Sequence, residues 1–166
     1  MTVTTRTALG ATTANRKWYC DVATLATPTV FVGLFGSTEL KVNPGTVSHT
    51  DTSDFEGEGY TAAEAFSAGW GAEGKVRRGT LATTPTEYDP GQEIVRIAGQ
   101  SMGAANQIIA RFYEMEPDGP RVEAVTGFVN VTWSEDGGAV TVGSMASFTL
   151  VGHGKPTSRV HPEVVV

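Results

Sequence analysis

The first candidate for chemistry is a serine between two glycines. The stretch Gly99-Gln100-Ser101-Met102-Gly103 has the G-x-S-x-G spacing that places a nucleophilic serine on a strand-to-helix turn. Asp118 or Asp136, followed by His153, would complete the chain order of a hydrolase triad. However, Ser101 falls at the end of a predicted helix, and the chain lacks the alternating strand and helix pattern of such hydrolases. We therefore expect no catalysis here.

A second candidate is a glycine-rich stretch with the letters of a dinucleotide-binding loop. In Gly69-Trp70-Gly71-Ala72-Glu73-Gly74 the glycines have the G-x-G-x-x-G spacing that lets a backbone approach a pyrophosphate. That fingerprint needs a strand before it and a helix after it. Here a loop is predicted before it and a strand after it, so the glycines are expected to serve a tight turn.

The spacing of the histidines and the cysteine does not indicate a metal site or thiol chemistry. His49, His153, His161 and Cys20 show no ligand spacing such as H-x-x-x-H or C-x-x-C. A lone cysteine cannot form an internal disulfide, so Cys20 is expected to be a buried free thiol in a reducing cytoplasm. We expect no metal, no cofactor and no enzymatic activity.

The net negative charge argues against a protein that binds nucleic acid tightly through its phosphates. The net charge is −6 at pH 7, and no Lys or Arg occurs between Asn43 and Ala72. That segment holds most of the acidic excess, either as a solvated loop or as a functional surface. The one basic cluster is expected to pair with acids of a neighbouring strand or subunit. It consists of Lys75, Arg77 and Arg78.

The most regular part of the chain is a predicted β-hairpin. Two runs rich in β-branched and aromatic residues, 121–133 and 139–153, flank the glycine-rich stretch Ser134 to Gly138. Side chains alternate along the first run, but both faces carry apolar residues, so neither face is expected to be simply solvated. Shorter strands are predicted at 16–22, 29–34, 39–42, 75–84 and 108–115.

One helix and one long loop complete the predicted elements. Asp89 is the expected N-cap, Pro90 the first helical residue and Gln92 the reciprocal capping residue of a helix ending near Met102. Ile94, Ile97, Ala98 and Ser101 share one face, and the two isoleucines are expected to pack on the sheet. The segment from Asn43 to Gly69 lacks any period and is predicted to be a loop.

Together these features predict one mostly β domain, a β-sandwich or barrel with one flanking helix and a long loop. Residues 1–14 form an extended arm in this interpretation, residues 15–154 the β domain, and residues 155–166 a C-terminal tail. The sequence has no apolar run long enough to span a membrane and no secretory signal at its start.

Several separated motifs resemble one family. Near the start is Asn15-Arg16-Lys17-Trp18-Tyr19, and in the middle is Asp51-Thr52-Ser53-Asp54-Phe55. Later come Ile109 to Glu114, Gly119-Pro120-Arg121, Glu123-Ala124, Gly127, Val131-Thr132-Trp133 and the closing Thr149 to Gly154. In order and spacing they resemble the major tail tube proteins of long-tailed bacteriophages, over most of the chain.

The resemblance implies a structural virion protein. Such subunits form hexameric rings that stack into the tail tube, the conduit for genome ejection, and DNA passes through the lumen without specific binding. The implied partners are further copies of the chain and the tape measure, terminator and distal tail proteins, with assembly in the host cytoplasm and a final place in the virion tail. A monomeric β-sandwich module that binds a small ligand or carbohydrate is the alternative.

Two groups of positions, acidic except for Phe55, are the candidate functional residues. We expect one group to form an inter-subunit or inter-ring loop, comprising Asp51, Asp54, Phe55, Glu56 and Glu58. Glu73 and Glu123 are the candidate lumen-facing residues. A conduit must not hold phosphates, so its wall is expected to carry more Asp and Glu than Lys and Arg.

Overall fold

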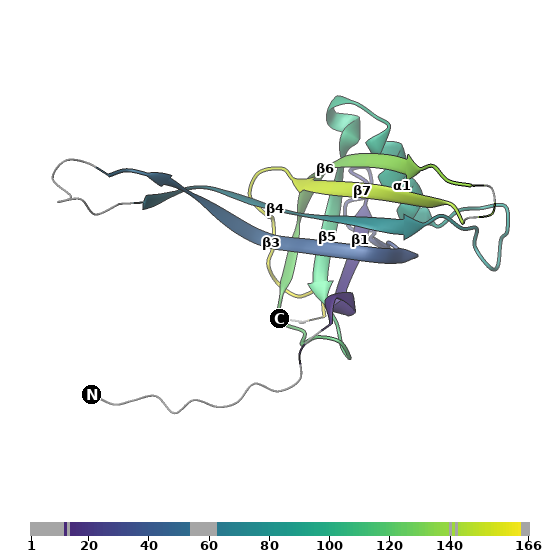
Figure 1. The fold of residues 1–166 in the computed structure, drawn as a ribbon, viewed down its shortest axis with the longest axis horizontal. Coiled ribbons are helices and arrows are strands. Elements are labelled where there is room, and N and C mark those ends of the chain that lie inside the picture. Colours follow the sequence, from purple (N-terminus) through teal and green to yellow (C-terminus); the bar gives the residue numbers. More distant parts are fainter. Residues whose placement is uncertain (1–11, 13, 54–62, 140, 142, 164–166) are drawn as a thin grey trace.

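The computed structural model describes residues 12, 14–53, 63–139, 141 and 143–163. Within these ranges the chain forms strands, one α-helix and two short 3-10 helices (Figure 1). The helices are α1 (Pro90–Gly99), η1 (Asn15–Lys17) and η3 (Gly103–Asn106). The strands are β1 (Trp18–Ala23), β2 (Val32–Gly33), β3 (Ser37–Asp51), β4 (Ala63–Arg77), β5 (Gln107–Glu114), β6 (Ala124–Asp136) and β7 (Met145–Gly152).

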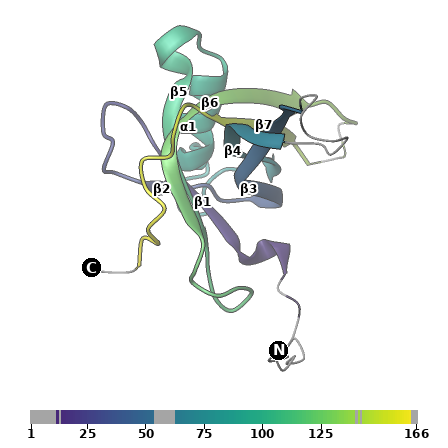
Figure 2. The same ribbon diagram turned by 90° about the vertical axis from the view of Figure 1, so that its left-hand side faces the viewer.

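The strands form one antiparallel sheet. Among the described residues it has seven strands, in the order β2-β1-β5-β6-β7-β4-β3. The long strand β6 bends between the part of the sheet that holds β1 and β5 and the part that holds β7, β4 and β3 (Figure 2). The expected mostly β fold with one flanking helix is confirmed, and the sandwich or barrel takes the form of a single curved sheet.

One face of this sheet carries the core. Along β6, Gly127, Val129 and Val131 are buried, whereas Phe128 and Thr132 on the other face are exposed. The buried face continues across the sheet through Phe112, Phe148, Leu150, Trp70 and Val76. The period of two in the β6 sequence therefore separates a core face from an outward face.

The predicted β6–β7 hairpin is confirmed, but its loop lies elsewhere. Trp133 pairs with Phe148, and Asp136 pairs with Met145. Strand β6 thus continues to Asp136, through residues expected to turn, and the connection runs over residues 137–144. Ser147 donates a 2.9 Å hydrogen bond to the Asp136 carboxylate, which contributes to holding this end of the hairpin.

The predicted loop from Asn43 to Gly69 is wrong. Both of its ends are strand: β3 continues to Asp51, β4 begins at Ala63, and the two strands pair from Ser37↔Val76 to Asp51↔Ala63. Strand β3 lies at the edge of the sheet, where Pro44 need not donate a ladder hydrogen bond. A register shift between Asn43 and Thr46 accommodates the proline and Gly45.

Helix α1 begins as predicted, and its packed face shares Ile94 and Ala98 with the predicted face but excludes Ile97. The Asp89 carboxylate accepts a 2.9 Å hydrogen bond from the Gln92 backbone N–H, whereas the Gln92 side chain donates to Phe35 O and Arg77 O instead of closing a capping box. The buried positions are Gly91, Gln92, Val95 and Ala98. Ile97 is 57% exposed, so the expectation that it packs on the sheet is wrong.

Close packing explains the error at Ile97. A Cβ atom at Gly91 would lie 2.3 Å from Gly33 O, and one at Gly99 would lie 2.5 Å from the Trp133 Cβ. The helix approaches the body closely at these two glycines, and the larger side chain of Ile97 points away. The helix also ends at Gly99, before the expected Met102.

Two strand predictions are corrected by the structure. Strand 29–34 is reduced to β2, and strand 75–84 ends at Arg77. The expected C-terminal tail packs on the sheet: the Thr157 N–H donates to Thr126 O at 2.8 Å, and the Thr126 N–H donates to Ser158 O at 2.8 Å. His161 is buried, and its Nε2 lies 2.7 Å from Glu114 O.

No helix among the described residues has the length and apolar character needed to cross a membrane. The expected arm, residues 1–14, lies outside the described residues except for Thr12 and Ala14.

Candidate functional site

The residues of the suggested hydrolase triad are not brought together. The Ser101 hydroxyl donates a 2.7 Å hydrogen bond to Ile97 O at the end of α1. Asp118 forms a 2.7 Å ion pair with Arg16, and Asp136 accepts from Ser147. His153 lies next to Asn130. Each of these residues therefore has a different partner, and the structure does not assemble them into a triad.

The glycine-rich stretch around Trp70 lies within β4, with strand before it as well as after it. The Trp70 indole is buried, and its Nε1–H donates a 2.9 Å hydrogen bond to Gly154 O. A Cβ atom at Gly152 would lie 2.3 Å from the indole, and one at Gly127 would lie 2.8 Å from it. Glycines near Trp70 thus make room for a large side chain between neighbouring strands, and the expected tight turn is absent.

The described residues contain no group of three His, Cys, Asp or Glu side chains that could hold a metal ion. Cys20 is a buried free thiol, and its burial, together with the nearby Asp21 carboxylate, raises its pKa above the usual range. A thiol held protonated in this way is a poor nucleophile. Four surfaces and pockets of the described part of the chain are candidates for binding.

The first surface is the outward face of β3, β4, β7 and β6. Lys41 and Glu73 lie directly opposite each other on β3 and β4 and form a 2.9 Å ion pair, which raises the pKa of the lysine. The rest of this face is made of hydroxyl side chains and further charges. Its acids are Glu39, Glu73 and Asp136, its bases are Lys41, Lys75 and Arg77, and its hydroxyls include Thr132, Thr149 and Ser147. The charges cancel, so this face has no acidic excess.

The two candidate lumen residues lie far apart. Glu73 is on this outward face, in register with Thr149 of β7, which is in register with Thr132 of β6. Glu123 immediately precedes β6, where its backbone exchanges hydrogen bonds with Glu114. Thr132 lies nine positions after Glu123 along the chain, which is about 30 Å of extended strand. The structure therefore does not bring Glu73 and Glu123 to one site.

The basic cluster divides between two environments. Arg78 is buried, forms a 2.9 Å ion pair with Glu93 of α1 and stacks on the Tyr88 ring at 4.0 Å. Hydrogen bonds from Arg96 and then from Arg78 outweigh burial and lower the pKa of the Glu93 carboxyl. Lys75 and Arg77 instead lie on the exposed face of β4. Of these three side chains, that of Arg78, which directly follows β4, is the one that pairs with the helix.

The second surface is the outer half of the β3–β4 hairpin, residues 46–51 and 63–69, which projects from the rest of the molecule (Figure 1). Every residue in these two ranges is exposed, including the apolar side chains of Val47 and Phe66. Asp51 accepts hydrogen bonds from the Ser53 hydroxyl and backbone N–H, which lower its pKa. The other predicted loop residues, Asp54, Phe55, Glu56 and Glu58, lie outside the described residues.

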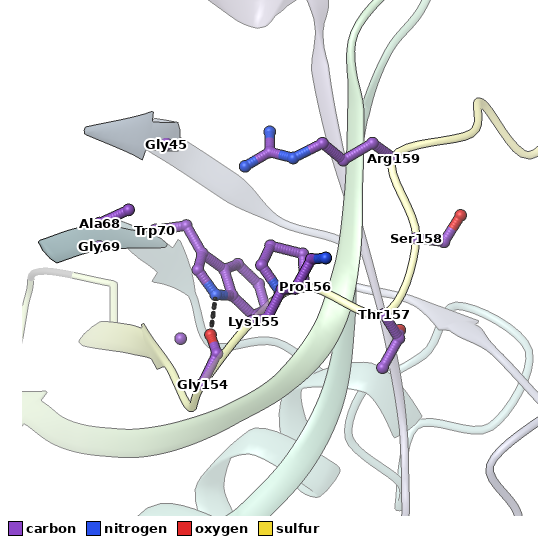
Figure 3. A pocket seen from close by; sticks show the side chains of 11 residues that line it. Gly45, Ala68, Gly69, Trp70, Gly154, Lys155, Pro156, Thr157, Ser158 and Arg159 are labelled. Carbon is purple, nitrogen blue, oxygen red and sulfur yellow. Dashed lines mark hydrogen bonds between the residues drawn. The ribbon is translucent and has the colours of Figure 1, made fainter. Parts of the chain in front are cut away.

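The third surface is a pocket at the base of this hairpin, with a volume of about 560 Å³. Trp70 contributes its indole, and the C-terminal segment contributes Lys155, Pro156 and Arg159 (Figure 3). Arg159 extends from that segment toward β3, where its Nη1 donates a 2.9 Å hydrogen bond to Pro44 O. We call this feature the base pocket. Sequence patterns did not indicate this pocket, because its two cations belong to the predicted tail.

The fourth surface is a groove of about 840 Å³ between β1 and β3. These strands lie near opposite ends of the strand order, yet both line this groove. Tyr19 and Phe35 are exposed at its walls, and Leu40 and Val42 are half-buried against the core. The outer edge of β3 has no strand partner among the described residues, so its backbone groups are open to pairing.

Comparison with known proteins establishes the fold. No protein-family model and no curated protein sequence matches the chain. Among solved structures, the chain is similar to one from the tail of an empty GTA particle, obtained by helical refinement with C6 symmetry, at a TM-score of 0.60. The sequences are 13% identical, and the match covers 89% of this chain and 98% of that chain. At this identity the likeness shows a shared fold.

Proposed function

We propose that this chain is a structural subunit of a phage-type tail that forms hexameric rings, and that these rings stack into a tube through which DNA passes. The observation that carries this proposal is the fold shared over nearly the whole length of a chain from a C6-symmetric tail. The motifs that resemble major tail tube proteins support the same assignment.

The exposed strand edge and hairpin support self-assembly. A long unpaired edge such as that of β3 is a liability in a monomer, because it templates pairing with other chains. Closure of a ring removes such edges. Val47 and Phe66 are apolar but exposed, and their exposure is explained if another copy covers the outer hairpin.

The outward face of β3, β4, β7 and β6 is our proposed lumen wall. Its acids and bases alternate and cancel, so a duplex that slides past meets no stripe of cations to hold its phosphates. This replaces the expected acidic excess with a balanced polar wall. Glu73 lies on that wall, whereas Glu123 lies at one end of the sheet, where it fits a subunit contact better.

The remaining expectations stay part of the proposal. We infer assembly in the host cytoplasm, a final place in the virion tail, and contacts at the tube ends with tape measure, terminator and distal tail proteins. We further infer that the chain acts without a cofactor and is not an enzyme.

Sedimentation velocity and negative-stain imaging of the purified chain over a range of concentrations test the proposal. We expect rings with sixfold symmetry and, as concentration rises, stacked tubes with a central channel. A chain that stays monomeric at every concentration would overturn the proposal and favour a β-sandwich binding module instead.

Hydrogen exchange on free subunits and tubes tests whether assembly covers the proposed contact strands. Amides on the outer hairpin should gain protection in the tube, because a second copy covers them. Amides of β5 and β6 provide the internal reference, since the fold already protects them. Unchanged exchange on the outer hairpin would exclude it as a contact surface.

A further inference from the structure

Part of strand β6 lacks a strand partner on one side, and the C-terminal segment lies there instead. Strand β5 pairs with β6 from Ala124 to Asn130, but β7 pairs with it only from Val129 onward. Among the described residues, the edge of residues 124–128 that faces away from β5 therefore has no strand beside it. The C-terminal segment, residues 153–163, runs along this edge.

Backbone hydrogen bonds hold the segment on this edge of β6. The Thr126 N–H donates to Ser158 O, and the Thr157 N–H donates to Thr126 O, both at 2.8 Å. Pro156 and Pro162 have no N–H to offer to a further strand. The segment thus covers an edge that could otherwise pair with another chain, and it does not create a new regular edge in its place.

The far end of the segment is fastened by the imidazole of His161. This side chain is 4% exposed, and its Nε2 lies 2.7 Å from Glu114 O of β5. Its Nδ1 accepts a 3.2 Å hydrogen bond from the Glu163 N–H. A carbonyl oxygen can only accept, so Nε2 carries the proton and Nδ1 has none. Both ring nitrogens therefore have suitable partners in the neutral imidazole.

We propose that the C-terminal segment is a pH-sensitive cover of the β6 edge, fastened by neutral His161 and released when the imidazole takes a second proton. That proton would sit on Nδ1 and point at the Glu163 N–H, so two donors would face each other. It would also place a charge on a buried ring. Release lets water solvate the imidazolium and exposes backbone groups of β6 that can pair with another chain. This inference concerns the free subunit and does not depend on the tube function.

The surroundings of His161 contain several titratable and charged groups. Those that contact His161, or that interact with a group in contact with it, are Lys17, Asp21, Arg111, Tyr113, Glu114, Glu116, Arg121 and Glu163. Tyr113 packs edge-on against the imidazole, with 5.6 Å between the ring centroids. Burial, and then the nearby Asp21 carboxylate, raise the pKa of Tyr113 to about 12, so this neighbour is neutral at the pH values considered.

The two carboxylates nearest to His161 are engaged by other cations. The Glu114 carboxylate is paired with Lys17, and the Glu163 carboxylate forms a 2.6 Å ion pair with Arg121. A second proton on the imidazole would therefore compete with these cations for a carboxylate. Opening of the segment avoids that competition, so the covered state is favoured at neutral pH and weakened as the pH falls.

The range from pH 5 to 8 isolates the histidines. Carboxylic acids, tyrosines, lysines and arginines ordinarily change charge outside this range, whereas an imidazole changes charge within it. The chain has three histidines, and His49 and His153 are exposed whereas His161 is buried. His49 lies on the outer hairpin, away from the segment. An effect of pH on the cover in this range therefore belongs to His161 or to His153, which begins the segment.

Hydrogen exchange on the unassembled subunit from pH 5 to 8, corrected for the intrinsic effect of pH on exchange, tests the cover. The reporters are the amides of Thr126 and Thr157, because their hydrogen bonds exist only while the segment lies on the edge. Uptake of one proton on release should lower their protection by up to about tenfold for each unit of falling pH. The amide of Val129, inside the β5–β6 ladder, is the reference and should keep its protection.

His161→Gln and His153→Gln are matched variants for this measurement. Glutamine keeps an N–H donor and a carbonyl acceptor but takes no proton in this range. The His161→Gln variant should show protection at Thr126 that no longer depends on pH, and the His153→Gln variant should respond to pH like the unmodified chain. The same pH dependence in the His161→Gln variant and the unmodified chain would overturn the proposal.

NMR of the His161 ring nitrogens in the unmodified chain keeps the test decisive even if glutamine fails to hold the segment. The ring should be the neutral Nε2–H tautomer at pH 8, and it should take its second proton over the same pH interval in which Thr126 loses protection. A ring that becomes charged while Thr126 stays protected would show that the cover is not released by this proton. Constant protection of Thr126 from pH 5 to 8 would likewise contradict the proposal.

Discussion

Strands β3 and β4 behave as two different structures along their length. Their inner parts, around Leu40, Ala72 and Val76, pack on the core, whereas their outer parts, from Thr46 to Asp51 and from Ala63 to Gly69, are exposed on both faces. The same backbone pairing runs through both parts. Burial thus stabilises the inner half within one subunit, and the outer half has only its own ladder. Such a strand pair is suited to covering by another chain.

The largest expected difference between the two halves comes from removing a phenylalanine ring. Phe148 is 2% exposed and packs in the core, so Phe148→Ala should lower the free energy of unfolding by about 3–5 kcal/mol. Phe66 on the outer hairpin is 82% exposed, so Phe66→Ala should change it by less than about 0.5 kcal/mol. Urea unfolding of the unassembled subunit measures both. A large loss with Phe66→Ala would show that the outer hairpin packs within its own subunit.

Lowering the pH should reduce the stability of the packed body, through Glu114, but not that of the outer hairpin. Burial raises the pKa of the Glu114 carboxyl, but hydrogen bonds from Lys17 and from the Glu123 and Val122 N–H groups outweigh it, so the pKa is lowered overall. The charged form of Glu114 thus stabilises the fold above its unfolded pKa of about 4.3, and this stability is lost as pH falls through the lower folded pKa. Glu114→Gln should cost about 2–3 kcal/mol at pH 7, because it leaves Lys17 without its partner, and less at pH 3.

Asp51 provides the comparison for Glu114. Its pKa is also lowered, by hydrogen bonds from Ser53, but it is fully exposed. Asp51→Asn should therefore leave the pH profile of subunit stability unchanged. Urea unfolding at pH 3 and pH 7 compares the two variants. If the free energy of unfolding changes equally with pH in the Glu114→Gln variant and the unmodified chain, Glu114 does not contribute the pH-dependent stability assigned to it.

Two glycines on β4 mark where the body ends. At Gly71, with φ 153°, a Cβ atom would lie 2.1 Å from Leu150 O, so Gly71→Ala should cost about 1–3 kcal/mol. At Gly69 nothing lies within 4 Å of such an atom, and Gly69→Ala should be neutral or gain up to about 0.5 kcal/mol. Thermal unfolding of both variants locates the boundary. Equal losses would place Gly69 within the packed body.

Sequence patterns predicted the packed half of the molecule far better than the exposed half. In β6 the alternation of buried Val129 and Val131 with exposed Thr132 reflects a sheet with one covered face, and the resulting period of two is readable. The outer hairpin has no covered face in the free subunit, so its sequence lacks that period. Pro44 and Gly45 added turn signals that an edge strand with a register shift tolerates.

The errors at the candidate sites have equally local causes. The helix face was predicted from the largest aliphatic residues, whereas close approach at Gly91 selects the small ones, and Ile97 faces away. The base pocket joins Trp70 of β4 to Arg159 of the C-terminal segment, residues far apart in the sequence. Nothing in their local patterns indicates that they meet, because their proximity follows from the sheet order.

The contacts at the base of the β3–β4 hairpin fix the direction in which its exposed half leaves the body. Trp70 is bound to Gly154 O and Arg159 to Pro44 O, so both strands are tied to the C-terminal segment at the point where burial ends. The outer strands are therefore oriented although no core covers them. A partner that covers them would meet a preorganised surface, and less conformational entropy would be lost on association.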